Sequence, residues 1–181
     1  NDLIDLDNIL TVNTWNLTND NNSIYSFNKV GINTTNPSSE LDVNGDANIS
    51  GTLNNKTKTL SNLANGTTLT NIQSGSTILQ SINNSTINLP ETSAGLTFTF
   101  IWTGAAGDAF NIAPHSNDKI MGSIIDHNSS INTADGSGDD GKMLQLGSSS
   151  NSKIGDRVKL LADGSDGWFI TEGLGDWSFE Q

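Results

Sequence analysis

One segment, residues 29–53, limits most strongly what this chain can fold into. It contains three short runs in which apolar and polar residues alternate between turn-forming residues: Val30/Ile32, Leu41/Val43 and Ala47/Ile49. Each run is too short to build a hydrophobic core by itself. We therefore expect the segment to bury its apolar side chains against identical segments of other copies, around a common axis, as a homo-oligomeric shaft.

The same segment resembles a pattern, "VGIGTTNP...KLDVNG...ISGTL", that recurs in tail fibres, spikes and collar proteins of bacteriophages and large DNA viruses. The resemblance covers about residues 24–53, and Pro37, Asn44-Gly45 and Gly51 fall where the pattern has them. Asn33 stands where the pattern has the second glycine of "GIG", and because asparagine tolerates a positive φ better than other non-glycine residues, we expect the turn to persist. The resemblance implies a trimeric, β-rich stalk.

Composition divides the chain into two parts. Twenty of the 25 asparagines lie in residues 1–90, whereas thirteen of the 20 acidic residues, five of the six Phe and three of the four Trp lie in residues 91–181. The aromatic part is large enough for a compact core of about 100 residues. We expect an Asn-rich trimeric β stalk with a linker over residues 1–75 and a head domain over residues 76–181.

The head shows a regular alternation of short strands and turns. Eight strands are predicted, near Thr77–Ile82, Thr86–Leu89, Leu96–Thr103, Ala109–Ala113, Lys119–Ile125, Lys142–Leu146, Arg157–Leu161 and Trp168–Glu172. Such spacing is typical of an antiparallel sandwich. The runs "INLP", "GLTFTF", "GDRVKL" and "GWFIT" within residues 77–177 also resemble patterns in viral fibre proteins. The predicted fold class is all-β: a homotrimeric intertwined β stalk followed by a C-terminal antiparallel β-sandwich, or jelly-roll-like, head.

Several classes of function are disfavoured by composition. The chain has no cysteine, which excludes disulfides, thiolate chemistry and most zinc sites. Its formal charge of −12, without a cluster of Lys or Arg, argues against nucleic-acid binding. No apolar run approaches the length of a membrane span, so no membrane insertion is predicted. Because the sequence starts at an asparagine without a signal-like segment, we expect it to be the C-terminal portion of a longer protein.

Metal and cofactor chemistry have little support. Asp135–Gly141 supplies three carboxylates as a calcium loop would, but the position of the acidic twelfth ligand is taken by Leu146. A solvated turn is therefore the favoured interpretation. His115 and His127 have aspartates nearby, yet they lack the short spacing of an axial His-x-His site. No metal site and no cofactor are predicted.

Aromatic side chains are the better lead to a site. No nucleophile-elbow motif surrounds any serine and no carboxylate pair stands out, so no catalytic residue is predicted and the chain is not expected to be an enzyme. Trp102, Trp168 and Trp177 could stack against sugar rings, and together with His115 they are the predicted receptor-binding residues. Burial in the core is the alternative for each tryptophan, above all for Trp168, which alternates with Ile170 on a strand.

The resemblance and the composition together imply the distal part of a homotrimeric viral fibre or spike on the virion. Its missing N-terminal part would contact other virion proteins, and its three heads would attach to a host surface, with a repeated glycan as the expected receptor. A purely structural fibre or collar component without a receptor is the main alternative, and a polysaccharide depolymerase is a third. Exposed head aromatics would favour attachment, whereas buried aromatics would favour the structural role.

Overall fold

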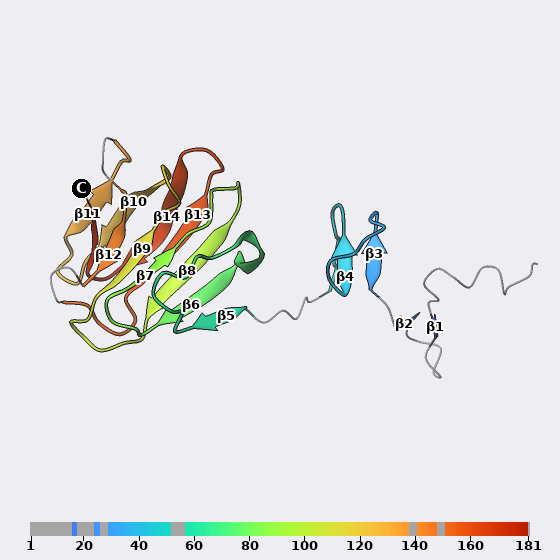
Figure 1. The fold of residues 1–181 in the computed structure, drawn as a ribbon, viewed down its shortest axis with the longest axis horizontal. Coiled ribbons are helices and arrows are strands. Elements are labelled where there is room, and N and C mark those ends of the chain that lie inside the picture. The colour runs from blue at the N-terminus through green and yellow to red at the C-terminus, as the bar shows by residue number, and fades with distance from the viewer. Residues whose placement is uncertain are drawn as a thin grey trace, which may run out of the picture. The chain divides into compact units, whose positions relative to one another are not determined.

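The computed structural model describes residues 16–17, 24–25, 29–51, 57–137, 141–147 and 151–180. The chain divides into two compact units, Asn1–Asn54 and Asn55–Gln181 (Figure 1). The described residues lie in strands and in the turns, bends and irregular segments between them, with a single 3₁₀ turn, η2 (Asn71–Gln73). The predicted all-β class is therefore confirmed.

The smaller unit contains two short strand pairs. β1 (Asn16–Leu17) runs antiparallel to β2 (Ile24–Tyr25), and β3 (Val30–Ile32) runs parallel to β4 (Leu41–Val43). Two of the three alternating runs are thus strands. The third run, around residues 47–49, has no regular secondary structure.

The turn after β3 depends on two asparagines. Asn33 has a φ of 58°, so it adopts the left-handed conformation expected at this position. Its side-chain amide donates to the carbonyl of Asn44 at 2.9 Å, and the amide of Asn44 donates back to the carbonyl of Asn33 at 3.2 Å. These two bonds connect the ends of β3 and β4.

The larger unit is built from two sheets that enclose one hydrophobic core (Figure 1). The first sheet has seven strands in the order β11-β10-β14-β13-β8-β6-β5, and the second has four in the order β15-β12-β9-β7. In chain order the strands are β5 (Thr59–Ser61), β6 (Ser76–Gln80), β7 (Ser85–Asn88), β8 (Thr97–Trp102), β9 (Phe110–Ala113), β10 (Lys119–Ile125), β11 (Ile131–Ala134), β12 (Leu144–Leu146), β13 (Arg157–Ala162), β14 (Gly167–Leu174) and β15 (Trp177–Phe179).

The first half of this unit is wound as a coil. After each strand of the first sheet the chain crosses to the second sheet and then returns, so that β5, β6 and β8 are parallel neighbours. On the second sheet β7 and β9 are parallel, and residues 66–69 lie beside β7 through a parallel bridge between Thr68 and Asn88. Stacked turns of this kind are typical of repeat proteins, in which each turn packs on its neighbours.

Asparagine side chains hold equivalent corners of the coil. Asn65 Oδ1 accepts the backbone N–H of Thr86 at 2.8 Å, and Asn83 Oδ1 accepts the backbone N–H of Ala109 at 2.9 Å. In both corners the following residue has a positive φ, 80° or 55°, and donates its own N–H to the carbonyl of the same partner at 2.8 Å. The high asparagine content thus has a structural use in this part of the chain.

The second half closes the sandwich with mostly antiparallel pairs. β13 runs antiparallel to both β8 and β14, while β10 is parallel to β14 and antiparallel to β11. β12 extends the second sheet from β9 and pairs with β15, both antiparallel. The sandwich is therefore mixed, and the prediction of an antiparallel one was wrong. The main reason is the coiled first half, in which each return to a sheet follows a full turn of the coil and repeats the strand direction. The parallel pair of β10 and β14 lies outside the coil.

Two further predictions need correction. The boundary between the units lies between residues 54 and 55, not between 75 and 76, because β5 pairs with β6 and Leu69 is buried in the core. Each of the eight predicted head strands corresponds to an observed strand, but β5, β11 and β15 were not predicted. All three are edge strands of three or four residues.

Candidate functional site

The three tryptophans predicted to bind a receptor lie in the core. Trp102 and Trp168 are 0% exposed and Trp177 is 1% exposed. The indole N–H groups of Trp102 and Trp177 donate to the backbone carbonyls of Ala105 and Leu174, at 3.0 and 3.2 Å. The rings are therefore not open to stack on a sugar, which corrects that part of the predicted site. Strand alternation is the cause, since each tryptophan lies at an inward position of its strand.

His115 lies apart from these residues, in the exposed turn between β9 and β10. Its ring Nε2 is 3.5 Å from the hydroxyl of Ser116, and its carbonyl accepts the N–H of Asp118 at 2.8 Å. The structure thus does not bring His115 together with the tryptophans. Its role in binding a receptor stays a prediction.

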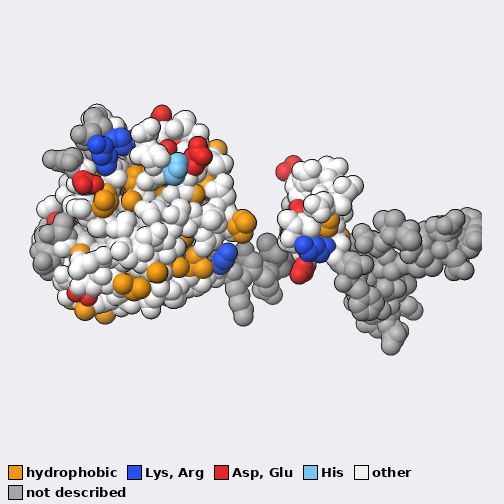
Figure 2. Space-filling view, in the orientation of Figure 1, with side chains coloured by type: hydrophobic (Ala, Val, Ile, Leu, Met, Phe, Trp, Pro, Cys, Tyr) orange, Lys and Arg blue, Asp and Glu red, His pale blue; other side chains and the backbone are white. Residues whose placement is uncertain are grey.

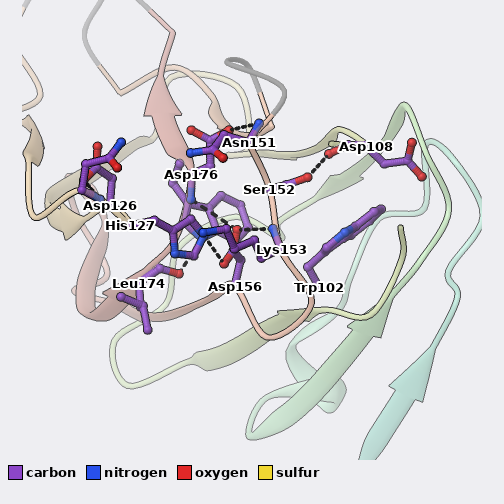
Figure 3. Close-up of polar contacts among 12 residues, drawn as sticks. Trp102, Asp108, Asp126, His127, Asn151, Ser152, Lys153, Asp156, Leu174 and Asp176 are labelled. Carbon is purple, nitrogen blue, oxygen red and sulfur yellow. Dashed lines mark hydrogen bonds and ion pairs between the residues drawn. The ribbon is translucent and has the colours of Figure 1, made fainter. Parts of the chain in front are cut away.

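A buried carboxylate joins three turns at one end of the sandwich (Figure 3). Asp156 precedes β13 and is 1% exposed, with its Oδ1 at 2.9 Å from Nε2 of His127 in the β10–β11 turn. Its Oδ2 accepts the backbone N–H groups of Lys153 at 2.9 Å and Asp176 at 3.3 Å. The contact with His127 has the length of an ion pair without the geometry of a hydrogen bond.

The neighbourhood of Asp156 is shaped for a structural role. Gly175 has a φ of 126°, and a Cβ there would lie 2.4 Å from Cγ of Asp156, so the carboxylate fills the place of a side chain. The nearby hydroxyl of Ser152 donates to the carbonyl of Asp108 at 2.6 Å, and not to His127 (Figure 3). Serine, histidine and aspartate are thus close together, but the serine is not positioned as a nucleophile activated by this histidine.

A polar groove of about 440 Å³ lies at another part of the larger unit. It is formed where the turn before β10, the residues after β11 and the β13–β14 turn meet, and it is lined by Asn117, Asp118, Lys119, Met121, Asp135, Gly136, Ser165 and Asp166. The lining is rich in oxygen atoms that accept hydrogen bonds, with Met121 as the main apolar contribution.

The β13–β14 turn on the wall of this groove is held by Asp163. Its Oδ1 accepts the N–H groups of Ser165, Asp166 and Gly167 at 2.8, 3.0 and 3.1 Å. These bonds, the one from Ser165 foremost, lower the pKa of Asp163 below its ordinary value. On the opposite wall, hydrogen bonds from the hydroxyl and the amide of Ser137 lower the pKa of Asp135. Both carboxylates therefore stay ionised and hold their loops at neutral pH.

One aromatic side chain is exposed beside the groove. Phe169 is 41% exposed and lies directly opposite Met121 in the parallel pair of β10 and β14, so both side chains are on the outer face of the seven-stranded sheet. Phe169 was missed from the sequence, where Trp168 drew attention instead. Trp168 and Phe169 are consecutive in a strand and face opposite sides of the sheet, so the observed burial of Trp168 identifies Phe169 as the exposed one.

The predictions about metals can be compared with the described part of the chain. Among these residues no group of three or more His, Asp or Glu side chains could hold a metal ion. Asp126 is turned towards its own loop, where its Oδ1 accepts the N–H groups of Asn128 and Ser130 at 2.7 and 2.8 Å. Two of the three carboxylates of the Asp135–Gly141 loop, at positions 139 and 140, lie outside the described residues.

The comparisons with known proteins add no identity. No protein-family model matches the sequence, and no curated protein matches it. In the described ranges there is also no helix with the length and apolar character needed to span a bilayer. The candidate site of this chain is therefore defined by its own geometry, as the groove beside Phe169.

Proposed function

We propose that this chain is the distal part of a homo-oligomeric viral fibre or spike, and that its larger unit attaches to a host surface glycan through the groove beside Phe169. The observation that carries the attachment is the combination of an acceptor-rich groove of about 440 Å³ with one exposed aromatic ring at its side. Sugars present hydroxyl groups that donate to such acceptors and C–H faces that pack on such rings.

The charge of the groove specifies the glycan further. Its lining carries three aspartates, Asp118, Asp135 and Asp166, against the single cation of Lys119. A sugar acid would bring its carboxylate into this negative field, whereas a neutral or amino sugar would not. The ligand class we propose is therefore a neutral or amino glycan. Weak single sites on several copies of one fibre would combine into stable attachment.

A second candidate role is favoured by a different observation. Trp102, Trp168 and Trp177 are all buried, which agrees with a head that only stabilises a fibre or collar and has no receptor. In that case the groove would be an ordinary surface depression. The two roles differ in whether the chain binds any glycan.

A glycan array probed with the full chain tests the proposal. We expect binding to neutral or amino glycans, a loss of at least tenfold in affinity for the variants Phe169→Ala and Asp166→Asn, and little change for Asp46→Asn. Asp46 is a matched control, because it is an exposed aspartate in the smaller unit. Binding that all three variants retain would move the site elsewhere, and no binding at all would favour the structural role.

The oligosaccharides that bind in this experiment also distinguish attachment from the depolymerase alternative. Mass spectrometry of the bound oligosaccharides would show shortened products if the chain cleaved them. We expect the oligosaccharides to be recovered intact. Light scattering on the same sample gives the number of copies, and a monomer at all concentrations would contradict the fibre proposal.

A further inference from the structure

The outer faces of the two sheets differ in chemistry. On the four-stranded sheet the outward positions are small or polar: Thr86, Asn88, Asn111, Ala113, Gln145 and Ser178. On the seven-stranded sheet large aliphatic side chains stand outward instead. A solvated sheet face normally resembles the first of these, so the second needs a physical explanation.

The outward side chains form a row that is aliphatic except at Arg157, and we call this row the aliphatic stripe. It takes one residue from each of six adjacent strands, every one directly opposite the next: Leu79, Ile101, Arg157, Leu174, Ile125 and Ile131. With strands about 4.8 Å apart, the row extends roughly 24 Å across the sheet. It lies at the opposite ends of β10 and β14 from the pair Met121 and Phe169, and therefore away from the groove.

The exposure of the stripe rises towards one edge. Leu174 is 36% exposed, Ile125 50% and Ile131 65%. Figure 2 shows hydrophobic side chains interrupting the polar surface of the larger unit on the face in view. Covering these three side chains with a partner would remove their exposed apolar surface from water, which favours association.

We propose that the aliphatic stripe is a contact surface for a second copy of this chain. This goes beyond the proposed function, which assigns no surface of the larger unit to contacts between copies. Two separate observations favour the same chain as the partner: the local charge of the larger unit and the exposed aliphatic side chains of the smaller one.

The first observation is the local charge. Residues 57–181 carry thirteen acidic and six basic side chains, so copies of this unit repel one another over most of their surface. The stripe and the positions beside it instead carry two cations, Arg157 and Lys159, and one carboxylate, Glu172. Oε1 of Glu172 is 2.7 Å from Nε of Arg157. The carboxylate of Glu172 is paired with Arg157, so an acidic surface of another copy meets a neutralised carboxylate and the cation of Lys159 here. Asp126, at the end of β10, is already bonded to its own loop.

The second observation is the exposure of aliphatic side chains in the smaller unit. Ile32 is 53% exposed, Leu41 60% and Ile49 54%. A second copy of this chain would bring aliphatic surface of its own to each of the two units. Once the smaller units associate, the stripes of neighbouring copies are held at high effective concentration.

Hydroxyl-radical footprinting of the full chain, read by mass spectrometry, tests the stripe directly. We expect oxidation of Leu174, Ile125 and Ile131 to fall at least threefold as the concentration rises from a range where light scattering gives a monomer to one where it gives an oligomer. Ile72, which is 88% exposed and lies in η2, is the internal control and should keep its rate.

If the wild type is oligomeric at every concentration, no monomer rate can be measured, and a variant with a disrupted stripe supplies the comparison instead. In Ile125→Lys/Ile131→Lys we expect Leu174 to oxidise at least threefold faster than in the wild type, with Ile72→Lys as the matched control that leaves this rate unchanged. Near-ultraviolet circular dichroism of the buried tryptophans checks that each variant is folded.

The outcomes separate this inference from the proposed function. An oligomer whose stripe oxidises at the monomer rate would overturn the stripe contact and leave the oligomeric fibre standing. A chain that stays monomeric at all concentrations would overturn both. Glycan binding without any stripe protection would leave only the attachment role.

Discussion

The two units of this chain use similar strands with different results. In the smaller unit β3 and β4 have three residues each, and Leu41 on β4 is 60% exposed. In the larger unit β5 is equally short, but its Leu60 is opposite Ile78 in β6, and Ile78 is 0% exposed. Alternation thus predicts strands in both units, whereas burial needs a second layer, and only the larger unit supplies one among its described residues.

This difference assigns separate tasks to the units. The larger unit has its own core and can hold a binding surface in place without a partner. The smaller unit exposes aliphatic side chains that another copy could cover. We therefore expect folding of the larger unit to be insensitive to changes in the smaller one, while association should be sensitive to both.

The largest expected effect is the loss of Phe110. Its ring lies within 5.9–6.1 Å, centroid to centroid, of those of Phe100, Trp102 and Trp177, so it connects the two sheets. Phe110→Ala should lower the free energy of unfolding of the larger unit by about 3–5 kcal/mol. Denaturant titration followed by tryptophan fluorescence measures this change.

Leu41→Ala is the matched truncation in the smaller unit. The same transition should move by less than about 0.5 kcal/mol, because the side chain is mostly exposed. The mass from light scattering should instead shift to lower oligomers. A large loss of stability of the larger unit on truncating Leu41 would contradict the separation of tasks.

The next effect in size comes from the buried carboxylate. Asp156→Ala leaves two backbone N–H groups and the ring of His127 without their partner, and should lower the free energy of unfolding by about 2–4 kcal/mol. Thermal or denaturant unfolding measures it. Asp46→Ala, an exposed aspartate of the smaller unit, is the control. Equal stability of the two variants would show that the Asp156 network does not stabilise the sandwich.

Strand positions were well predicted because alternation is a local property. Lys119–Ile125 was predicted with the same bounds that β10 has. The direction of pairing was not predictable in this way, since it depends on which strands become neighbours after the coil turns of residues 59–113. The strand β5 was missed because three residues carry too little periodicity.

The site was predicted less well than the fold, for a reason visible at one position. A tryptophan that points into the core and one that points to solvent cannot be told apart by residue type. The sequence around Trp168 did not determine which face of its strand is buried. Its neighbour Phe169 became identifiable only once the core was known. The groove itself joins residues 117–121, 135–136 and 165–166, which no local pattern connects.

A moderate effect is expected at the corners of the coil. Asn83→Ala removes the acceptor for the N–H of Ala109 and should cost about 1 kcal/mol of the free energy of unfolding. Asn128→Ala, at an exposed position in the β10–β11 turn, is the control and should cost less than about 0.5 kcal/mol. If both variants unfold at the same denaturant concentration, the corner bond does not stabilise the coil.

The smallest effect concerns two half-buried aspartates, Asp42 and Asp163, one in each unit. Hydrogen bonds from the amide and hydroxyl of Ser38 lower the pKa of Asp42 below its ordinary value of 3.8, as the bonds from Ser165 and Gly167 do for Asp163. A lowered pKa in the folded chain means that the ionised form stabilises the loop above pH 3.8 and that this contribution is lost as the pH falls through the folded value. Carboxyl carbon titration by NMR should show both groups ionising below pH 3.8, with faster amide exchange at Ser38 and Gly167 once the carboxyl that each bonds is protonated.

The two units should differ in how far protonation loosens the loop. Gly167 begins β14 inside the larger unit, whereas Ser38 lies in an exposed loop of the smaller unit. Protonation should therefore speed amide exchange more at Ser38 than at Gly167. If both amides were to exchange equally fast at neutral and acidic pH, after correction for the intrinsic rate, neither carboxylate would be holding its turn.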